Sequence, residues 1–330
     1  MGRIFFIVGM CVVVISAAVG GGWLWLTRGF DAPGPLKSDV TLIIPKGSGT
    51  GSIANNLVSA GIIGDPLIFK LGHRFLSAPG PMRAGEYRFL AGMSAAGTIK
   101  LLQSGKTVVR KLTIAEGLSN AEIATLISRA QGLTGLTGPL PAEGGLLPET
   151  YHFSFGDRRS TLVARMRGAM TKLLGELWPK RAPNLPIKTP EAAMILASIV
   201  EKETGTAEER PRVAAVFHNR LRKNMRLQSD PTVVFGLTLG RAPLGRPISK
   251  ADLKSETAFN TYVIKGLPPG PIANPGRAAI ESVLRPAITD ELYFVADGTG
   301  GHAFAKTLKQ HQRNVVKWRK IEKARRKTSQ

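Results

Sequence analysis

The feature that most constrains this chain is an uncharged apolar run near its N-terminus. Residues 4–26 contain no Asp, Glu, Lys or Arg, and a helix of that length can cross the ~30 Å hydrocarbon core of a bilayer. Trp23 and Trp25 lie at the end of the run, where an aromatic belt would meet the membrane interface. Because a lipid-exposed segment must satisfy its own backbone hydrogen bonds, the run predicts one transmembrane helix.

A cleaved signal peptide is the rival interpretation of this run, with Ser-Ala-Ala at residues 16–18 as the processing site. The apolar part of a signal peptide usually covers ~7–15 residues, whereas this run continues well beyond residue 18. A short head before the run and nearly the whole chain after it favour a signal anchor, with the head in the cytoplasm. The single cysteine, Cys11, lies within the run, so cysteine usage says nothing about the redox compartment.

The chain as a whole is strongly basic, with 45 Lys and Arg against 23 Asp and Glu. Such a balance favours anionic partners such as phospholipid surfaces, nucleic acid or acidic wall polymers. Part of the excess lies in residues 306–327, where Glu322 is the only acidic residue. No series of aromatic residues accompanies these charges, and the tail is predicted to be exported. We therefore expect a solvated basic helix or tail and no nucleic-acid partner.

Two segments of the chain echo each other at a constant offset of 70 residues. Leu42-Ile-Ile-Pro-Lys-Gly47 precedes Ile53-Ala54, and Leu112-Thr-Ile-Ala-Glu-Gly117 precedes Ile123-Ala124. Each segment predicts a strand, a glycine turn and an amphipathic helix. Two copies favour two small α+β units over a solenoid, for which three or more repeats are needed.

The remaining pattern predicts further elements between Pro/Gly-rich breaks. Residues 31–38 read as a juxtamembrane linker and residues 131–145 as a boundary. Thr189 and Pro190 have the N-cap and first-turn signature of a helix that runs to Glu201. Other helices are predicted over 95–103, 161–178 and 210–222, and strands over 85–89 and 293–296.

Glu201 is the candidate for proton transfer because of its apolar surroundings. It follows the helical run Met194-Ile-Leu-Ala-Ser-Ile-Val200, and a carboxyl group there loses hydration, so its pKa rises and it can stay protonated near neutral pH. A proton donor to a leaving group needs this property. The alternative is an ordinary ion pair at a helix end, with Lys202, Arg210 or Arg212 as the partner.

Two polar loops follow this helix. The first places Gln228 and Asp230 in a turn around Pro231, where short side chains bond nearby backbone or a sugar hydroxyl. The second carries Asn260 and Tyr262 and continues into a segment rich in Pro and Gly, residues 266–276. Such a segment is stiff and holds side chains at low entropic cost, which suits binding of an extended polymer.

Other catalytic plans fit the sequence poorly. The five histidines show no H-E-x-x-H or other metal-ligand spacing, and the sequence has no G-x-S-x-G nucleophile elbow. We therefore expect neither a metal hydrolase nor a nucleophilic triad, and neither a metal nor a cofactor.

A series of longer motifs runs in order along the chain. It comprises Leu147-Pro-Glu-Thr-Tyr151, Ala197-Ser-Ile-Val-Glu-Lys-Glu-Thr204, Glu209-Arg210 with Val213-Ala-Ala-Val-Phe217 and Asn219-Arg-Leu221, Met225-Arg-Leu-Gln-Ser-Asp-Pro-Thr-Val233, Asn260-Thr-Tyr262, Gly266-Leu-Pro-Pro-Gly270 and Tyr293-Phe-Val-Ala-Asp297. These motifs closely resemble the YceG-like family of endolytic murein transglycosylases. The likeness covers most of the chain up to His311, but Phe259 stands where the family often has tyrosine.

The resemblance implies an α+β fold with an N-terminal transmembrane helix, a small LysM-like α+β unit and a mixed α+β catalytic domain. The expected bounds are 1–38 for the anchor and linker, 39–110 for the LysM-like domain, 111–311 for the catalytic domain and 312–330 for a basic C-terminal tail. It also implies a single-pass inner-membrane enzyme whose catalytic domain lies in the periplasm.

The resemblance further implies cleavage of nascent glycan strands between MurNAc and GlcNAc, with 1,6-anhydroMurNAc ends that terminate elongation. Glu201 is then the catalytic residue, and Gln228, Asp230, Asn260 and Tyr262 are the predicted substrate contacts. The expected partners are peptidoglycan strands, membrane lipid through residues 4–26 and, as a candidate, a peptidoglycan synthase complex.

Two other functions stay open at this point. One is a non-catalytic, membrane-anchored scaffold that binds peptidoglycan, although the polar and rigid density of residues 197–276 exceeds what a scaffold needs. The other is a glycoside hydrolase that uses two carboxylates, Glu201 and Asp230.

Overall fold

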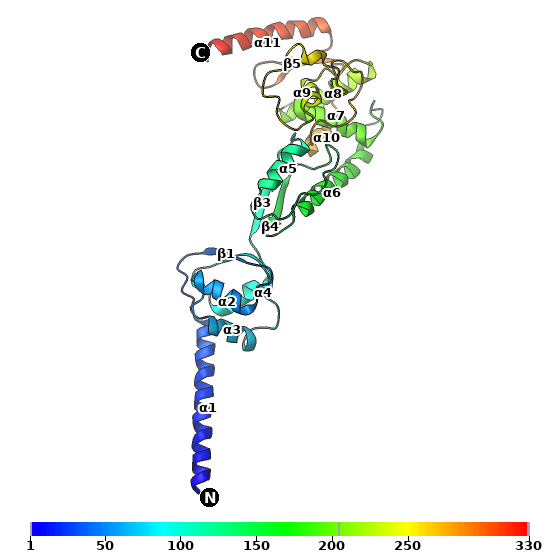
Figure 1. The fold of residues 1–330 in the computed structure, drawn as a ribbon. Helices are drawn as coiled ribbons and strands as arrows, with labels where there is room; N and C mark the ends of the chain where they lie inside the picture. The colour runs from blue at the N-terminus through cyan, green and yellow to red at the C-terminus, as the bar shows by residue number, and fades with distance from the viewer. Residues whose placement is uncertain (1, 204, 329–330) are drawn as a thin grey trace. The chain divides into compact units, whose positions relative to one another are not determined.

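The computed structural model describes residues 2–203 and 205–328, and the chain divides into two compact units (Figure 1). Unit 1 comprises residues 1–110 and 153–156, and unit 2 comprises residues 111–152 and 157–330. Both contain helices and small two-stranded sheets, so the predicted α+β class is confirmed.

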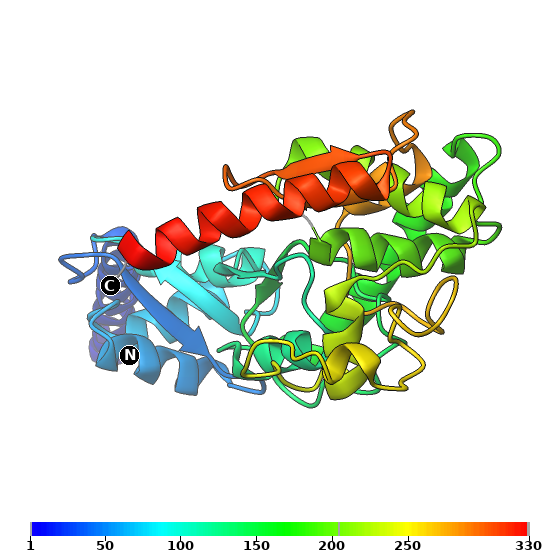
Figure 2. The same cartoon turned by 90° about the horizontal axis from the view of Figure 1, so that it is seen from above.

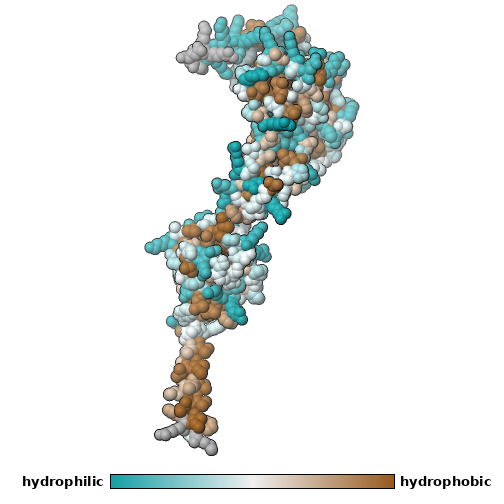
Figure 3. All heavy atoms as spheres, viewed as in Figure 1, coloured by the Kyte–Doolittle hydropathy of each residue, from teal (hydrophilic) through white to brown (hydrophobic). Residues whose placement is uncertain are grey.

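Unit 1 begins with the long apolar helix α1 (Gly2–Asp31). Its length and composition over Ile4–Asp31 are those of a helix that could cross a membrane, and hydrophobic side chains surround its free length (Figure 3). The last turns of α1 are buried at Leu26 and Phe30. A Cβ atom at Gly72 would lie 2.3 Å from a ring carbon of Phe30, so α1 ends inside the core of unit 1.

The segment that follows α1 is irregular, as its Pro and Gly content predicts, but it is held in place. Gly34 N donates a hydrogen bond to Gly92 O at 3.2 Å, and Gly92 N donates to Leu36 O at 2.8 Å. Leu36 also packs against the core of unit 1. The segment therefore is part of unit 1 and does not act as a free spacer.

The rest of unit 1 is one antiparallel strand pair packed with three helices. β1 (Val40–Ile44) pairs with β2 (Gly85–Phe89), with Val40 opposite Phe89. The helices are α2 (Thr50–Ser59), α3 (Pro66–Phe75) and α4 (Ala95–Ser104). α3 was not predicted, although Asp65 provides an N-cap whose carboxylate accepts a hydrogen bond from Leu67 N at 2.6 Å.

The boundary between the units falls within the two strands β3 (Val109–Thr113) and β4 (Thr150–Ser154), which pair with each other. α5 (Asn120–Arg129) follows β3 in unit 2. Both predicted strand–turn–helix echoes are present, because β1 leads to α2 as β3 leads to α5. Gly47 and Gly117 occupy the turns with φ of +80° and +76°, the left-handed region that favours glycine.

Helices are the main regular elements of unit 2, and α7 lies at their centre. The helices are α6 (Arg159–Leu177), η1 (Trp178–Lys180), α7 (Pro190–Glu203), η2 (Ala207–Glu209), α8 (Arg210–Arg222), α9 (Asp230–Thr238), η3 (Asp252–Lys254), α10 (Arg277–Leu284) and α11 (Leu308–Thr328). α7 packs against α8, α9 and α10, and Leu196, Ile199 and Val200 are completely buried there. This packing fixes the end of α7, where Glu201 lies.

A hairpin of β5 (Tyr293–Ala296) and β6 (His302–Ala305) carries the basic helix α11 (Figure 2). The His311 ring stacks on Tyr293 with the ring centres 5.1 Å apart. Residues 312–328 of the region expected to be a tail therefore continue a helix that begins on the folded part of unit 2.

Candidate active site

Glu201 is placed by the last turn of α7. The helix starts as predicted, because Thr189 Oγ1 accepts a hydrogen bond from Ala192 N at 3.2 Å. The apolar face of α7 is buried in the core. Glu201 lies twelve residues after Thr189, and its side chain is only 4% exposed. The sequence expectation that this carboxyl group loses hydration agrees with its position.

Two donors contact the Glu201 carboxyl group. Gly276 N donates a hydrogen bond to Oε2 at 2.8 Å, and Arg210 Nη2 donates to Oε1 at 3.4 Å. Burial raises the pKa of Glu201 above its ordinary value, and the nearby Glu116 charge adds to this. The Gly276 bond and the charges of Arg210 and Lys202 oppose the rise in pKa. The two interpretations of Glu201 offered by the sequence, a poorly hydrated acid and an ion-paired carboxylate, therefore both apply.

Glu116 is a second carboxylate beside Glu201 that the sequence-based list of site residues omitted. It lies in the turn between β3 and α5, and Arg210 Nη2 contacts its Oε2 at 3.5 Å. A Cβ atom at Gly276 would lie 1.7 Å from Glu116 Oε1, so the carboxylate occupies space that only a glycine leaves free. The two echoed segments differ at this residue, because the first has Lys46 where the second has Glu116. That difference is the signal by which the sequence could have identified Glu116.

The buried residue Asn274 holds this turn against the segment that precedes α10. Asn274 N donates to Leu118 O and Gly117 N donates to Asn274 O, each at 2.9 Å. Its side chain donates to Leu118 O and accepts from Leu146 N, also at 2.9 Å. Because all of these groups are paired, Gly276 and Glu116 are both fixed next to Glu201.

A cavity of about 370 Å³ opens beside this cluster. Its lining includes Gly117 and Lys202, which follow Glu116 and Glu201 in the chain, and also Asp230 and Phe235. Lys202 Nζ donates to Gly117 O at 3.1 Å. Among the predicted substrate contacts, Asp230 is the residue that lines this cavity.

Asp230 and Tyr262 are brought together, as the two predicted loops meet. The Tyr262 hydroxyl donates to Asp230 Oδ1 at 2.6 Å. Burial and the Asp230 carboxylate raise the pKa of Tyr262, so this phenol acts as a hydrogen-bond donor at neutral pH. Asp230 is the first residue of α9, whereas the sequence predicted a simple turn there.

Gln228 and Asn260 have different surroundings. Gln228 is exposed and has a φ of +52°, a conformation that non-glycine residues rarely adopt outside functional or tightly held sites. Asn260 is completely buried, and its Nδ2 donates to Leu253 O at 3.2 Å and to Ser255 O at 2.7 Å. Its Oδ1 accepts from Tyr262 N at 3.0 Å. These bonds favour an indirect contribution of Asn260 to a substrate site, through the position of Tyr262.

Glu203 is another titratable residue that the sequence analysis left out. The buried Ser229 hydroxyl donates to Glu203 Oε1 at 2.5 Å. Burial raises the pKa of Glu203 to about 7, and the charge of Asp230 acts in the same direction. The Ser229 hydrogen bond and the neighbouring His302 and Arg220 side chains act against it. Glu203 thus connects α7 to the loop that carries Asp230.

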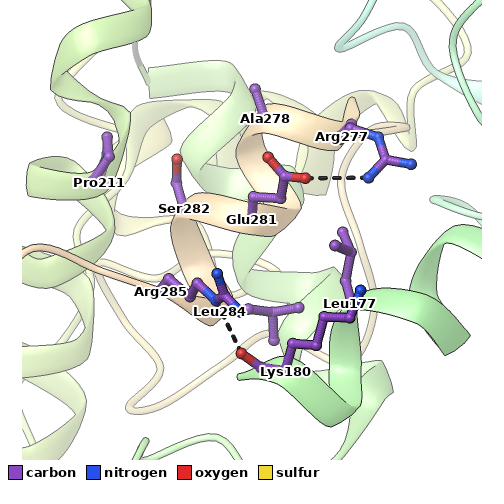
Figure 4. A pocket seen from close by; sticks show the side chains of 9 residues that line it. All are labelled: Leu177, Lys180, Pro211, Arg277, Ala278, Glu281, Ser282, Leu284 and Arg285. Carbon is purple, nitrogen blue, oxygen red and sulfur yellow. Dashed lines mark hydrogen bonds and ion pairs between the residues drawn. The ribbon is translucent and has the colours of Figure 1, made fainter. Parts of the chain in front are cut away.

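A larger groove of about 510 Å³ lies along α10 (Figure 4). Arg277 Nη1 donates to Glu281 Oε1 at 3.2 Å, and Arg285 Nε donates to Lys180 O at 2.9 Å. None of the predicted site residues lines this groove.

Within the described residues, no group of three or more His, Cys, Asp or Glu side chains could hold a metal ion.

Comparison with known proteins gives a consistent assignment. A family model described as the YceG-like family matches residues 42–317. An endolytic murein transglycosylase from Bacillus subtilis is 30% identical over 91% of this chain and 91% of its own length. An endolytic murein transglycosylase from Streptococcus pneumoniae is also 30% identical, over 92% of this chain, which spans 64% of that relative's length. The solved structure of a yceG-like protein from Listeria monocytogenes matches with a TM-score of 0.51 and 30% identity, covering 84% of this chain and 99% of that one.

Proposed function

Since the chain belongs to the YceG-like family, we propose that it is an endolytic lytic transglycosylase that cleaves peptidoglycan glycan strands between MurNAc and GlcNAc. The product would carry a 1,6-anhydroMurNAc end, which terminates elongation of the strand. The observation that supports this chemistry is the Glu201 carboxyl group, which is buried, bonded to Gly276 N and Arg210, and next to a cavity.

The reaction requires one carboxyl group to act twice. Glu201 first donates its proton to the glycosidic oxygen, and the bond between that oxygen and C1 of MurNAc breaks. The Glu201 carboxylate then accepts the proton of the C6 hydroxyl of the same MurNAc, whose oxygen forms the new bond to C1. Glu201 is protonated again at the end, and no water is consumed, so the second carboxylate of a typical hydrolase is not required.

The surroundings of Glu201 suit both of these steps. Burial favours the neutral acid that the first step needs. The Gly276 N–H and the Arg210 guanidinium favour the carboxylate that the second step needs. The raised pKa of Glu201 thus favours the acid before bond cleavage, and the two donors stabilise the carboxylate that follows.

For the cellular location, we propose a single-pass anchor in the inner membrane with unit 2 in the periplasm. The apolar helix α1 supports the anchor by its length and composition. Nascent glycan strands are made at that membrane surface, so the substrate would be available there, and a peptidoglycan synthase complex is the candidate partner.

The test is mass spectrometry of glycan strands digested by the full chain in detergent or proteoliposomes. We expect 1,6-anhydroMurNAc ends from the parent protein and a loss of at least ~100-fold in rate from Glu201→Gln. The control is Glu176→Gln, which removes the same charge from an exposed side chain on α6. This variant should cleave at the parent rate.

The alternatives give different products. Reducing ends in place of anhydro ends would indicate the two-carboxylate hydrolase with Glu201 and Asp230. Binding of glycan without any product would indicate a scaffold, and full activity of Glu201→Gln would remove Glu201 from the mechanism.

A further inference from the structure

Glu116 is a charged group beside Glu201 that the proposed reaction leaves without a role. Glu116 comes from the turn after β3, 85 positions before Glu201 in the chain, yet both side chains contact the same nitrogen. Arg210 Nη2 lies 3.5 Å from Glu116 Oε2 and 3.4 Å from Glu201 Oε1. The two carboxylate oxygens are therefore no more than about 7 Å apart, where like charges interact across a protein interior.

The two carboxylates also share a second neighbour. Gly276 N donates to Glu201 Oε2 at 2.8 Å. The Glu116 carboxylate lies against the Cα of the same residue, where a Cβ atom would be 1.7 Å from its Oε1. Asn274 fixes this arrangement, because it belongs to the segment that carries Gly276 and bonds the turn that carries Glu116.

Arg210 is not saturated by either partner. Its contacts of 3.4 and 3.5 Å are at the long end of hydrogen-bond geometry. In the described part of the chain, its buried Nε has no hydrogen-bond partner. A single guanidinium divided between two acids compensates each of them incompletely, in contrast to a bidentate pair such as Arg212 with Glu291.

We propose that Glu116 is a positioning residue of the active site, which adjusts the proton affinity of Glu201 by direct repulsion and by competing for Arg210. This inference rests on the proposed function of Glu201 as acid and base. The Glu116 charge keeps the proton on Glu201 before bond cleavage, and Arg210 stabilises the carboxylate after the proton has left. The groups that face Glu201 are Glu116 from the turn, Arg210 from α8, Lys202 on α7 itself and the Gly276 N–H.

The proposal predicts opposite shifts in the pH dependence of cleavage. The acid step needs protonated Glu201, so kcat/KM falls as pH rises through its pKa. Glu116→Gln removes the like charge, so this alkaline limb should move to lower pH. Arg210→Gln removes the compensating cation, so the limb should move to higher pH. A merely structural role would lower the rate of both variants without moving their limbs apart.

Conservative variants and a matched control complete the experiment, in which the full chain cleaves purified uncrosslinked glycan strands. Arg210→Lys retains the positive charge and should restore the parent position of the limb. Glu176→Gln removes one exposed carboxylate elsewhere on unit 2 and should leave the limb in place. The proposal would be overturned if the alkaline limb of Glu116→Gln coincided with that of the parent. It would also be overturned if the limbs of Glu116→Gln and Arg210→Gln moved in the same direction.

A second measurement needs no cleavage and therefore separates this proposal from the proposed function. Glu201→Gln is compared by thermal unfolding at pH 8 in the parent and in the Glu116→Gln background. We expect Glu201→Gln to raise the unfolding temperature more when Glu116 is present, because only then does it relieve repulsion between the two acids. Equal effects in both backgrounds would refute the coupling, even in a protein that produces no anhydro ends.

Discussion

Replacing Glu203 by Gln should stabilise unit 2 at neutral and alkaline pH. The pKa of this carboxyl group is raised by burial from 4.5 to about 7 in the folded chain. The unfolded chain therefore ionises Glu203 at lower pH than the folded chain does. The resulting penalty on folding is absent below pH 4.5, grows as pH rises and is complete above pH 7.

The size of the effect follows from the same two values. A tenfold change in proton affinity corresponds to about 1.4 kcal/mol, so the full penalty is about 3 kcal/mol. Gln has no charge to desolvate, and its side-chain oxygen can still accept the Ser229 hydrogen bond that Glu203 accepts at 2.5 Å. Glu203→Gln should thus match the parent near pH 4.5 and exceed it by about 3 kcal/mol at pH 8.

The assay is chemical denaturation of the full chain in detergent at several pH values, followed by tryptophan fluorescence. Trp178 and Trp318 report on unit 2 once Trp23 and Trp25 in α1 are replaced by Phe. Glu203→Ala is the control, because it removes the same ionisable group but leaves the buried Ser229 hydroxyl without its acceptor, so it should be about 1–3 kcal/mol less stable than Glu203→Gln at every pH. A Glu203→Gln curve that runs parallel to the parent from pH 4.5 to 8 would refute the reasoning.

Two further predictions concern buried polar residues of unit 2. His218 Nε2 donates a hydrogen bond to Val283 O at 2.8 Å, and burial lowers the pKa of His218 to about 4. Stability should therefore fall by up to about 3 kcal/mol as pH falls from 6.5 to 4, a loss that denaturation of His218→Gln should not show. Asn274→Ala leaves Leu146 N and Leu118 O without their side-chain partner. We therefore expect the free energy of unfolding to fall by at least about 2 kcal/mol in denaturation and cleavage to become slower. Parent-like values of both would contradict the role given to Asn274.

Much of the fold could be predicted because local signals mark the ends of its elements. α8 covers Arg210–Arg222 and β2 covers Gly85–Phe89, the same residues that the sequence pattern predicts. The start of α7 could be recognised from a capping residue followed by proline at Thr189 and Pro190. For α7 the interactions that define the start lie within a few residues of it, whereas β2 also depends on its pairing with β1.

α9 was missed because its signals are ambiguous at short range. Asp230 and Pro231 suit a turn as well as a first helical turn. The helix is only nine residues long and its apolar residues do not gather on one face, so no period distinguishes it. Its contacts with α7, which come from distant parts of the sequence, decide the outcome.

The candidate site divides in the same way. The lost hydration of Glu201 follows from its own helix and could be predicted. Its contact with the turn that holds Glu116 depends on tertiary packing through Asn274. The burial of Asn260 likewise depends on backbone carbonyls of residues 253 and 255 that fold around it. A direct contact between Asn260 and the substrate stays a prediction, and the buried position of Asn260 favours a role through Tyr262.

If α1 is the membrane anchor that we propose, the way it enters unit 1 sets the height of that unit above the lipid. Trp25 is still 47% exposed, whereas Phe30 is 6% exposed and packed against Gly72. Five residues of helix separate them, a rise of about 7.5 Å. If Trp25 marks a membrane interface, unit 1 begins directly at that interface, because Leu26 is already only 5% exposed. Insertion of whole helical turns between Trp25 and Leu26 would then lift unit 1 away from the interface in steps of about 5.4 Å.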